Sequence, residues 1–293
     1  MSNKTKGILY IITAAFFFAL MNTFVRLSGD LPPMQKSFFR NFIAFFVALF
    51  LLLRTEEKFS FKKENLPFFI FRAFFGTIGI FCNYYAIDHL LLSDATMLNK
   101  LSPFFAVIAS YFILKERLSL SQALCIIIAF IGSLFIIKPG AGGLSASFPS
   151  FIGLIGGICA GTAYTFVRLL SKKGERGPFI VFFFSGFSCL ASIPFFAFNF
   201  HPMTLFQIIY LICAGLAAAA AQFAITAAYS NAAASEISIY DYTQVIFSAL
   251  LGFILFSQVP DMYSILGYII ICSVSMFNFI KANKKTRIYM KKA

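Results

Sequence analysis

The chain has 293 residues, of which 60% are hydrophobic and only 12% are charged, and its mean hydropathy is +0.85. A soluble domain of this length cannot bury so much apolar surface, so the composition excludes a soluble protein and indicates one solvated mainly by lipid. The net charge of +13 does not indicate nucleic-acid binding, because the basic residues lie in short loops between apolar runs and not on one continuous face.

Ten apolar segments are candidates for membrane-spanning helices, because crossing the hydrocarbon takes roughly 20 residues of helix. The first five are predicted at Gly7–Leu27, Met34–Leu53, Leu66–Ile87, Leu92–Leu114 and Gln122–Ile137. The second five are predicted at Phe151–Leu170, Pro178–Phe198, Thr204–Tyr229, Ala234–Phe256 and Met262–Ile280. Residues 139–150 are rich in helix breakers and are predicted to link a first domain, 1–138, to a second, 151–281, which a basic tail, 282–293, follows.

The two sets of segments are copies of each other. The pentapeptide Thr-Phe-Val-Arg-Leu occurs at Thr23–Leu27 and again at Thr165–Leu169, each time closing an apolar segment. The same shift of 142 residues aligns Asn22 with Tyr164, Ser93 with Ser235, Asp94 with Glu236, Asn99 with Asp241, and Lys100 with Tyr242. An odd number of spans in each copy turns the second copy upside down, so the sequence predicts an all-α integral membrane protein of ten transmembrane helices in two inverted five-helix repeats. Inverted repeats are typical of secondary transporters.

The distribution of Lys and Arg agrees with ten spans. With the N-terminus in the cytoplasm, the outer loops hold only Lys36 and Lys138. The inner segments then hold Lys4, Lys6, Arg54, Lys58, Lys62, Lys63, Lys115, Arg117, Lys172, Lys173, Arg176, Lys281, Lys284, Lys285, Arg287, Lys291 and Lys292. Because one span more or fewer would destroy this asymmetry, both termini are predicted to be cytoplasmic.

Lys100 and Asp241 lie well inside the fourth and ninth segments. An ionised residue at the centre of a membrane helix costs about 2.5–3.5 kcal/mol on insertion scales, so each needs a reason to be there. An inverted duplication brings equivalent points of these two segments close together at mid-depth. We therefore predict a Lys100–Asp241 pair that faces a central wet cavity. The alternative is an ion pair that only ties the two halves together.

Further polar residues are candidates for the substrate-binding wall of this cavity. They are Asn22, Asn83, Tyr84, Asn99, Tyr164, Gln222, Thr226, Tyr242 and Gln244. For each of them the alternative is ordinary hydrogen bonding between helices. Pro103 removes a backbone hydrogen bond from the fourth segment, so a kink is predicted there, with one carbonyl freed and a role as a hinge for gating as one option.

Four arginines lie toward helix ends. Arg26, Arg72 and Arg168 are predicted to be anchors, because long side chains near a helix end can reach the lipid headgroups. Arg40 sits deepest and is a candidate for the cavity mouth. Glu236 is a candidate carrier of a coupling proton, because desolvation raises the pKa of a carboxyl group.

Several short motifs carry a resemblance to a known family. They are Ser102-Pro103, Leu114–Leu118, Gly132 and Ile136–Pro139 in the first half, and Leu251–Phe253 and Phe256–Pro260 in the second. With them the chain resembles the drug/metabolite transporter superfamily, EamA type, over nearly its whole length. Families of this kind often carry Glu where Gln258 stands. The resemblance implies alternating access, and members move amino acids, nucleotide derivatives, sugars, vitamins and drugs in either direction.

A secondary transporter is the predicted function, and Lys100 and Arg40 favour an anionic or zwitterionic metabolite. The alternatives are an exporter of drug-like or amphipathic compounds and a membrane-embedded enzyme. An enzyme is disfavoured because His89 and His201 fall in outer loops and no nucleophile–base pattern occurs. The six cysteines lie in apolar segments without a CxxC pair, so we expect no metal and no cofactor. We expect a small-molecule substrate, proton or ion coupling, and a monomer or homodimer in a bacterial cytoplasmic membrane.

Overall fold

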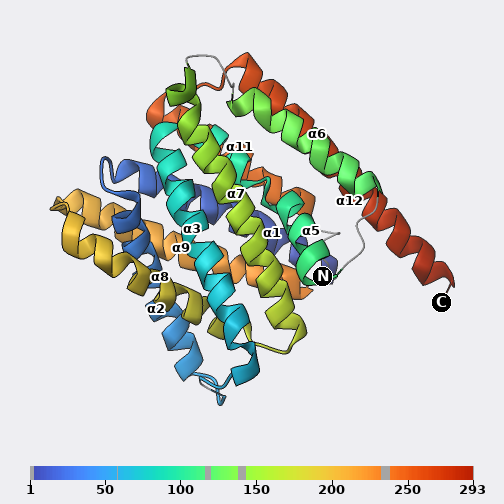
Figure 1. Cartoon of the computed structure of the whole chain (residues 1–293), viewed down its shortest axis with the longest axis horizontal. Helices are drawn as coiled ribbons and strands as arrows, with labels where there is room; N and C mark the ends of the chain where they lie inside the picture. Colours follow the sequence, from blue (N-terminus) through green and yellow to red (C-terminus); the bar gives the residue numbers. More distant parts are fainter. Residues whose placement is uncertain (1–2, 58, 116–119, 138–142, 232–237, 293) are drawn as a thin grey trace.

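The computed structural model describes residues 3–57, 59–115, 120–137, 143–231 and 238–292, and these form helices joined by short loops (Figure 1). The first half contains α1 (Asn3–Leu27), α2 (Pro33–Leu53), the 3-10 turn η1 (Lys63–Asn65), α3 (Leu66–His89), α4 (Leu92–Asn99), α5 (Ser102–Ile113) and α6 (Leu120–Ile137). The second half contains α7 (Gly143–Lys172), α8 (Gly177–Asn199), α9 (Leu205–Asn231), the 3-10 helix η2 (Ser238–Tyr242), α11 (Thr243–Phe256) and α12 (Met262–Lys292).

The helices confirm an all-α membrane protein. Within the described residues, seven apolar spans are long enough to cross a bilayer, and α4 and α5 together form one of them. Three shorter apolar helices lie in α6, in η2 with α11, and in α12, which brings the total to the ten predicted segments. Helices suit this environment because the backbone finds no water in the hydrocarbon and must satisfy its hydrogen bonds internally.

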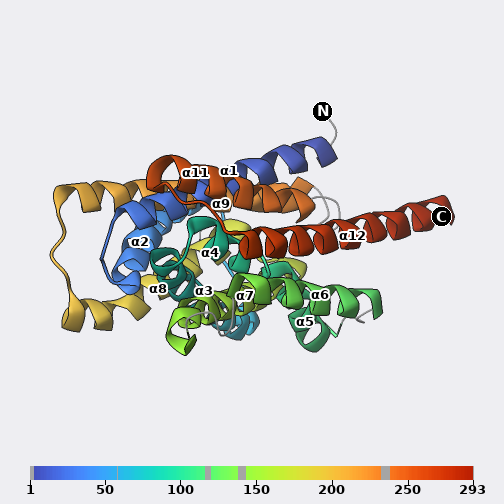
Figure 2. The same ribbon diagram turned by 90° about the horizontal axis from the view of Figure 1, so that it is seen from above.

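The packing of the two halves follows the duplication. α1 packs along α9, and α7, the counterpart of α1, packs along α3, the counterpart of α9. Helices α2 and α8, which are counterparts, contact each other, and so do α6 and α12. Figures 1 and 2 show α12 beside α6 at one end of the molecule and α2 beside α8 at the other. The halves are therefore interleaved, and a site at the centre is shared by both.

The fourth apolar segment is interrupted at the place where a kink was predicted. α4 ends at Asn99 and α5 begins at Ser102, so Pro103 lies in the first turn of a new helix. A proline is tolerated there because the N–H of a first-turn residue has no acceptor within its helix. The second half is interrupted at the equivalent place, since η2 gives way to α11 after Tyr242, the counterpart of Lys100. Both copies thus depart from a regular α-helix at equivalent positions.

Glycines of α7 hold this break close to the helix. A Cβ added at Gly157 would lie 2.7 Å from the Leu98 carbonyl oxygen, and one added at Gly161 would lie 2.4 Å from that of Ser102. No larger side chain fits between these backbones without a shift. Small residues allow such approach where lipid provides no hydrophobic drive for association. The turn that carries Lys100 is therefore fixed against α7.

Two helices extend further than the sequence predicted. α7 begins at Gly143, so the second part of the stretch expected to be a linker is helical, while residues 138–142 lie outside the described ranges. Pro149 lies inside α7, because a proline in a membrane helix frees one carbonyl but does not force the helix to end. α12 continues to Lys292, so the basic tail prolongs the last span as a helix.

Candidate functional site

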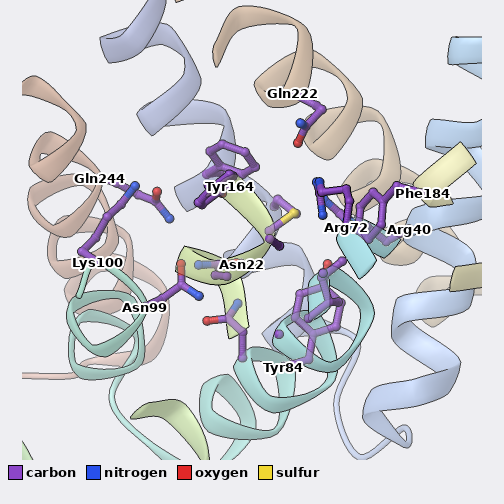
Figure 3. Close-up of a pocket in the computed structure, with 18 residues that line it drawn as sticks. Asn22, Arg40, Arg72, Tyr84, Asn99, Lys100, Tyr164, Phe184, Gln222 and Gln244 are labelled. Carbon is purple, nitrogen blue, oxygen red and sulfur yellow. The ribbon is translucent and has the colours of Figure 1, made fainter. Parts of the chain in front are cut away.

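A polar cavity lies at the centre of the molecule, between the two halves (Figure 3). Its lining comes from α1, α2, α3, α7, α8, α9 and α11 and from the end of α4, so both copies contribute. The cavity itself has a volume of about 90 Å³. The predicted residues that line it are Asn22, Arg40, Asn83, Tyr84, Asn99, Lys100, Tyr164, Gln222 and Gln244.

The predicted pair of Lys100 and Asp241 is present. The Lys100 Nζ lies 2.6 Å from the Asp241 Oδ2, and the two side chains are only 7% and 11% exposed. Lys100 lines the cavity, whereas Asp241 and Tyr242 are not among its lining residues and lie behind it. The Tyr242 hydroxyl donates a 3.0 Å hydrogen bond to the Lys100 carbonyl. Both residues therefore position Lys100, and its charge is balanced within the protein.

Arg72 is the main residue that sequence reasoning missed, and its prediction as a headgroup anchor is wrong. Its side chain is buried and lines the cavity, with the guanidinium carbon 4.2 Å from the centre of the Phe184 ring. The cause is Gly76, one turn further along α3, where a Cβ would collide with the Arg72 Nη1. Without that Cβ, Arg72 extends over its own helix toward the cavity. The spacing of Arg72 and Gly76 is the signal in the sequence that could have shown this.

Arg40 lines the cavity on the same wall as Arg72 (Figure 3), and its place at the mouth stays a prediction. Its Nη1 donates a 2.8 Å hydrogen bond to the Asn41 Oδ1. The Asn41 amide nitrogen donates in turn to the Ser37 carbonyl at 2.9 Å and to the Ser188 hydroxyl at 2.8 Å. This chain of hydrogen bonds orients Asn41 and fixes Arg40 against Phe184, whose ring centre is 6.0 Å from the guanidinium carbon.

The wall formed by the two arginines carries positive charge that no described carboxylate compensates. Both side chains are buried, and neither forms an ion pair with a carboxylate of the described residues. Their Nε atoms are buried and have no hydrogen-bond acceptor in the described part of the chain. Unpaired buried cations are unfavourable unless an anion accompanies them, so this wall is suited to a negatively charged ligand.

The remaining candidates lie outside the cavity or outside the described residues. Glu236 belongs to residues 232–237, and the side chain of Thr226 on α9 also lies outside the described residues. Arg26 is not a headgroup anchor, because its Nη1 donates to the carbonyls of Ile87, at 2.9 Å, and Leu90. These carbonyls at the end of α3 lack hydrogen-bond donors within the helix. A cationic side chain such as that of Arg26 supplies the donor. Arg168 is exposed on α7, and its role as an anchor stays a prediction.

Comparison with known proteins identifies the scaffold. Residues 5–138 and 148–280 each match the model of the EamA-like transporter family. The chain belongs to this family. The EamA-like match confirms the resemblance seen in the sequence, with one repeat in each half, and it confirms that the chain is a multi-pass membrane transporter and not an enzyme.

Individual EamA-like relatives match over most of their length. The pseudopaline exporter CntI of Pseudomonas aeruginosa is 30% identical, over 90% of this chain and 93% of its own. The riboflavin transporter of Vibrio cholerae is 26% identical, over 96% of each chain. A protein of known crystal structure superposes with a TM-score of 0.67 at 15% sequence identity, over 96% of this chain and 98% of its own. That superposition supports the fold alone.

Proposed function

We propose that the protein is a secondary transporter that moves a small anionic or zwitterionic metabolite by alternating access. The observation that carries this proposal is the central cavity, where the guanidinium groups of Arg40 and Arg72 have no carboxylate partner among the described residues. The third cationic group of the cavity, that of Lys100, is balanced by Asp241. A negatively charged group on the substrate supplies the missing counter-charge.

Alternating access is supported by the arrangement of the two halves around the cavity. Both copies line it; the first is interrupted at Lys100, which lines the cavity, and the second passes from η2 to α11 at Tyr242, which contacts Lys100. Discontinuous membrane helices at a central site are typical of inverted-repeat transporters, because the halves can rock around a fixed site. In this proposal the chain lies in a bacterial cytoplasmic membrane with both termini inside, as a monomer or homodimer. Proton or ion coupling, with Glu236 as its carrier, is part of the same proposal.

The second candidate function is export of drug-like or amphipathic compounds. The two related transporters named above are a pseudopaline exporter and a riboflavin transporter, so relatives of this chain carry polar metabolites. Lipophilic cations fit poorly beside two unpaired guanidinium groups, because like charges repel at close range in a low-dielectric site. A neutral amphipathic compound is the remaining competitor.

A thermal-shift screen of the purified full-length protein against a metabolite library tests the proposal. A ligand that binds the folded state raises its stability with the logarithm of the ligand concentration over Kd. Anionic or zwitterionic compounds are expected to raise the unfolding temperature, and the best of them to be taken up by proteoliposomes that contain the protein. Stabilisation by cations or neutral amphipathic compounds alone would contradict the proposal.

A further inference from the structure

We propose that Arg40 and Arg72 form a subsite for a dianionic group, either two neighbouring carboxylates or one phosphate monoester. This inference rests on the proposed function and names the charge and chemistry of the substrate. The first argument is the charge of the site. Two guanidinium groups from α2 and α3 meet at one ring, that of Phe184 on α8, and no described carboxylate pairs with either. Two negative charges neutralise this wall, whereas one leaves a buried cation unpaired.

The second argument is the direction of the available donors. Each guanidinium presents a planar fork of N–H groups that matches two oxygens of a carboxylate or phosphate. Phe184 covers one side of both groups, and the Nε of each has no acceptor among the described atoms. The hydroxyl of Tyr84 is also buried without a described partner, and Figure 3 places Tyr84 on the same side of the cavity. The wall thus offers several hydrogen-bond donors that have no acceptor among the described residues. The oxygen atoms of a bound ligand can accept from them.

The third argument is that the two arginines are held in place. Arg40 is oriented by Asn41, which is bound to α8 through Ser188. Arg72 occupies space that exists only because Gly76 has no side chain: a Cβ there would also lie 2.7 Å from the Phe184 ring. A preformed arrangement lowers the entropy that must be lost when a ligand binds. The subsite is therefore built into the fold and does not depend on the ligand to assemble it.

The opposite wall fits an uncharged part of the same substrate. Figure 3 shows Asn99, Lys100 and Gln244 across the cavity from the arginines, with Asn22 and Tyr164 between. The Asn22 Oδ1 is buried and has no donor among the described residues. Side-chain amides both donate and accept hydrogen bonds, so this wall suits hydroxyl or amide groups. The substrate is thus a dianionic head attached to a neutral polar body.

A matched series of small probes tests the charge requirement. Succinate, its monoamide succinamate and its diamide succinamide have nearly the same shape and carry two, one and no negative charges. O-phosphoserine and serine form the phosphate arm of the experiment. Each probe is added at millimolar concentration to the purified full-length protein, with ionic strength matched by sodium chloride, and the unfolding temperature is measured. Succinate or O-phosphoserine is expected to stabilise the protein more than its less charged partners do, and the arm that responds identifies the group.

Variants of the arginines connect the effect to the site. Arg40→Gln and Arg72→Gln are each expected to weaken binding of the active dianion by about ten- to a hundredfold, the range for losing a charge-assisted hydrogen bond. Arg72→Lys keeps the charge but loses the fork, so an intermediate loss is expected. The matched control is Arg54→Gln, at the exposed end of α2, which is expected to bind like the unmodified protein. Size-exclusion profiles and unfolding temperatures without ligand show whether each variant is folded.

Two results would overturn the dianionic subsite. One is found in the unmodified protein: a dianion and its singly charged partner stabilise it equally, or neither dianion stabilises it. The other is full dianion binding by a folded Arg72→Gln variant. If a singly charged or zwitterionic metabolite is nevertheless transported, the dianionic subsite is wrong and the proposed function stands. If no anionic or zwitterionic compound is transported, both are wrong.

Discussion

Lys100 and Tyr242 are counterparts in the two copies of the duplication, and they contact each other. The Tyr242 hydroxyl lies 3.0 Å from the Lys100 carbonyl oxygen, and the two residues are 142 positions apart, the same shift that aligns the two copies. A residue can reach its own counterpart only near the axis that relates the copies. The axis therefore passes beside the break after Asn99 and beside the junction of η2 and α11, next to the central cavity.

Removing this hydroxyl tests how much the contact stabilises the break. Tyr242→Phe is expected to lower the free energy of unfolding by about 0.5–1.5 kcal/mol, the usual net contribution of one hydrogen bond. The measurement is thermal unfolding in detergent. Tyr263→Phe, at the exposed start of α12, is the matched control and is expected to have no effect. An unchanged unfolding temperature for Tyr242→Phe would show that the freed carbonyl of Lys100 does not need this donor.

A charge swap tests the pair of Lys100 and Asp241. Lys100→Asp and Asp241→Lys are each expected to destabilise the protein strongly, because each places two like charges in one buried site. The double variant restores opposite charges and is expected to recover part of the lost stability. A double-mutant cycle of unfolding temperatures measures the coupling. Additive defects in the double variant would contradict direct coupling between the two side chains.

Gly76→Ala tests the position of Arg72 without removing any polar group. The new methyl group meets the Arg72 Nη1 and the Phe184 ring, so the guanidinium has to leave its place. Substrate affinity is expected to fall by about tenfold, the equivalent of one weakened charge-assisted hydrogen bond. The readout is the concentration dependence of uptake into proteoliposomes.

Gly186→Ala is the matched control for this substitution. Its Cβ would touch the Phe45 ring at 3.2 Å, and neither residue lines the cavity. Affinity is expected to be unchanged in this variant. Equal affinities in the two glycine variants would show that the place of Arg72 does not affect substrate binding.

Cysteine labelling tests the inverted arrangement of the halves. Lys173→Cys, between α7 and α8, and Pro202→Cys, between α8 and α9, both lie in exposed loops. In a background without the native cysteines, an impermeant thiol reagent applied to intact cells is expected to label Cys at position 202 and not at position 173. Reversed labelling would place both termini outside the cell. Labelling of both positions from one side would contradict a spanning α8.

Much of the scaffold follows from local features of the sequence, and so does part of the site. The repeated Thr-Phe-Val-Arg-Leu motif and the isolated charges of Lys100 and Asp241 are visible without a structure, because they depend on position along each helix and on the symmetry of the copies. Arg72 was missed because its direction depends on a missing Cβ at Gly76 and on a ring from α8. The predicted kink lies where the break after Asn99 is found, but the sequence does not show the partner of the freed carbonyl, because that partner, Tyr242, comes from the other half.

Arg40 and Arg72, which pair with no described carboxylate, also affect how the carrier returns after it releases its substrate. An empty carrier that returns across the membrane has to enclose two guanidinium groups that pair with no described carboxylate, and on insertion scales each such charge costs about 2.5–3.5 kcal/mol. A carrier that returns with a second substrate molecule avoids this penalty. We expect labelled substrate to enter proteoliposomes preloaded with unlabelled substrate at least about tenfold faster than it enters empty ones. Exchange, and not net flow, is then the fast mode of this protein, and equal rates in the two preparations would show that the empty cavity acquires counter-ions from solution.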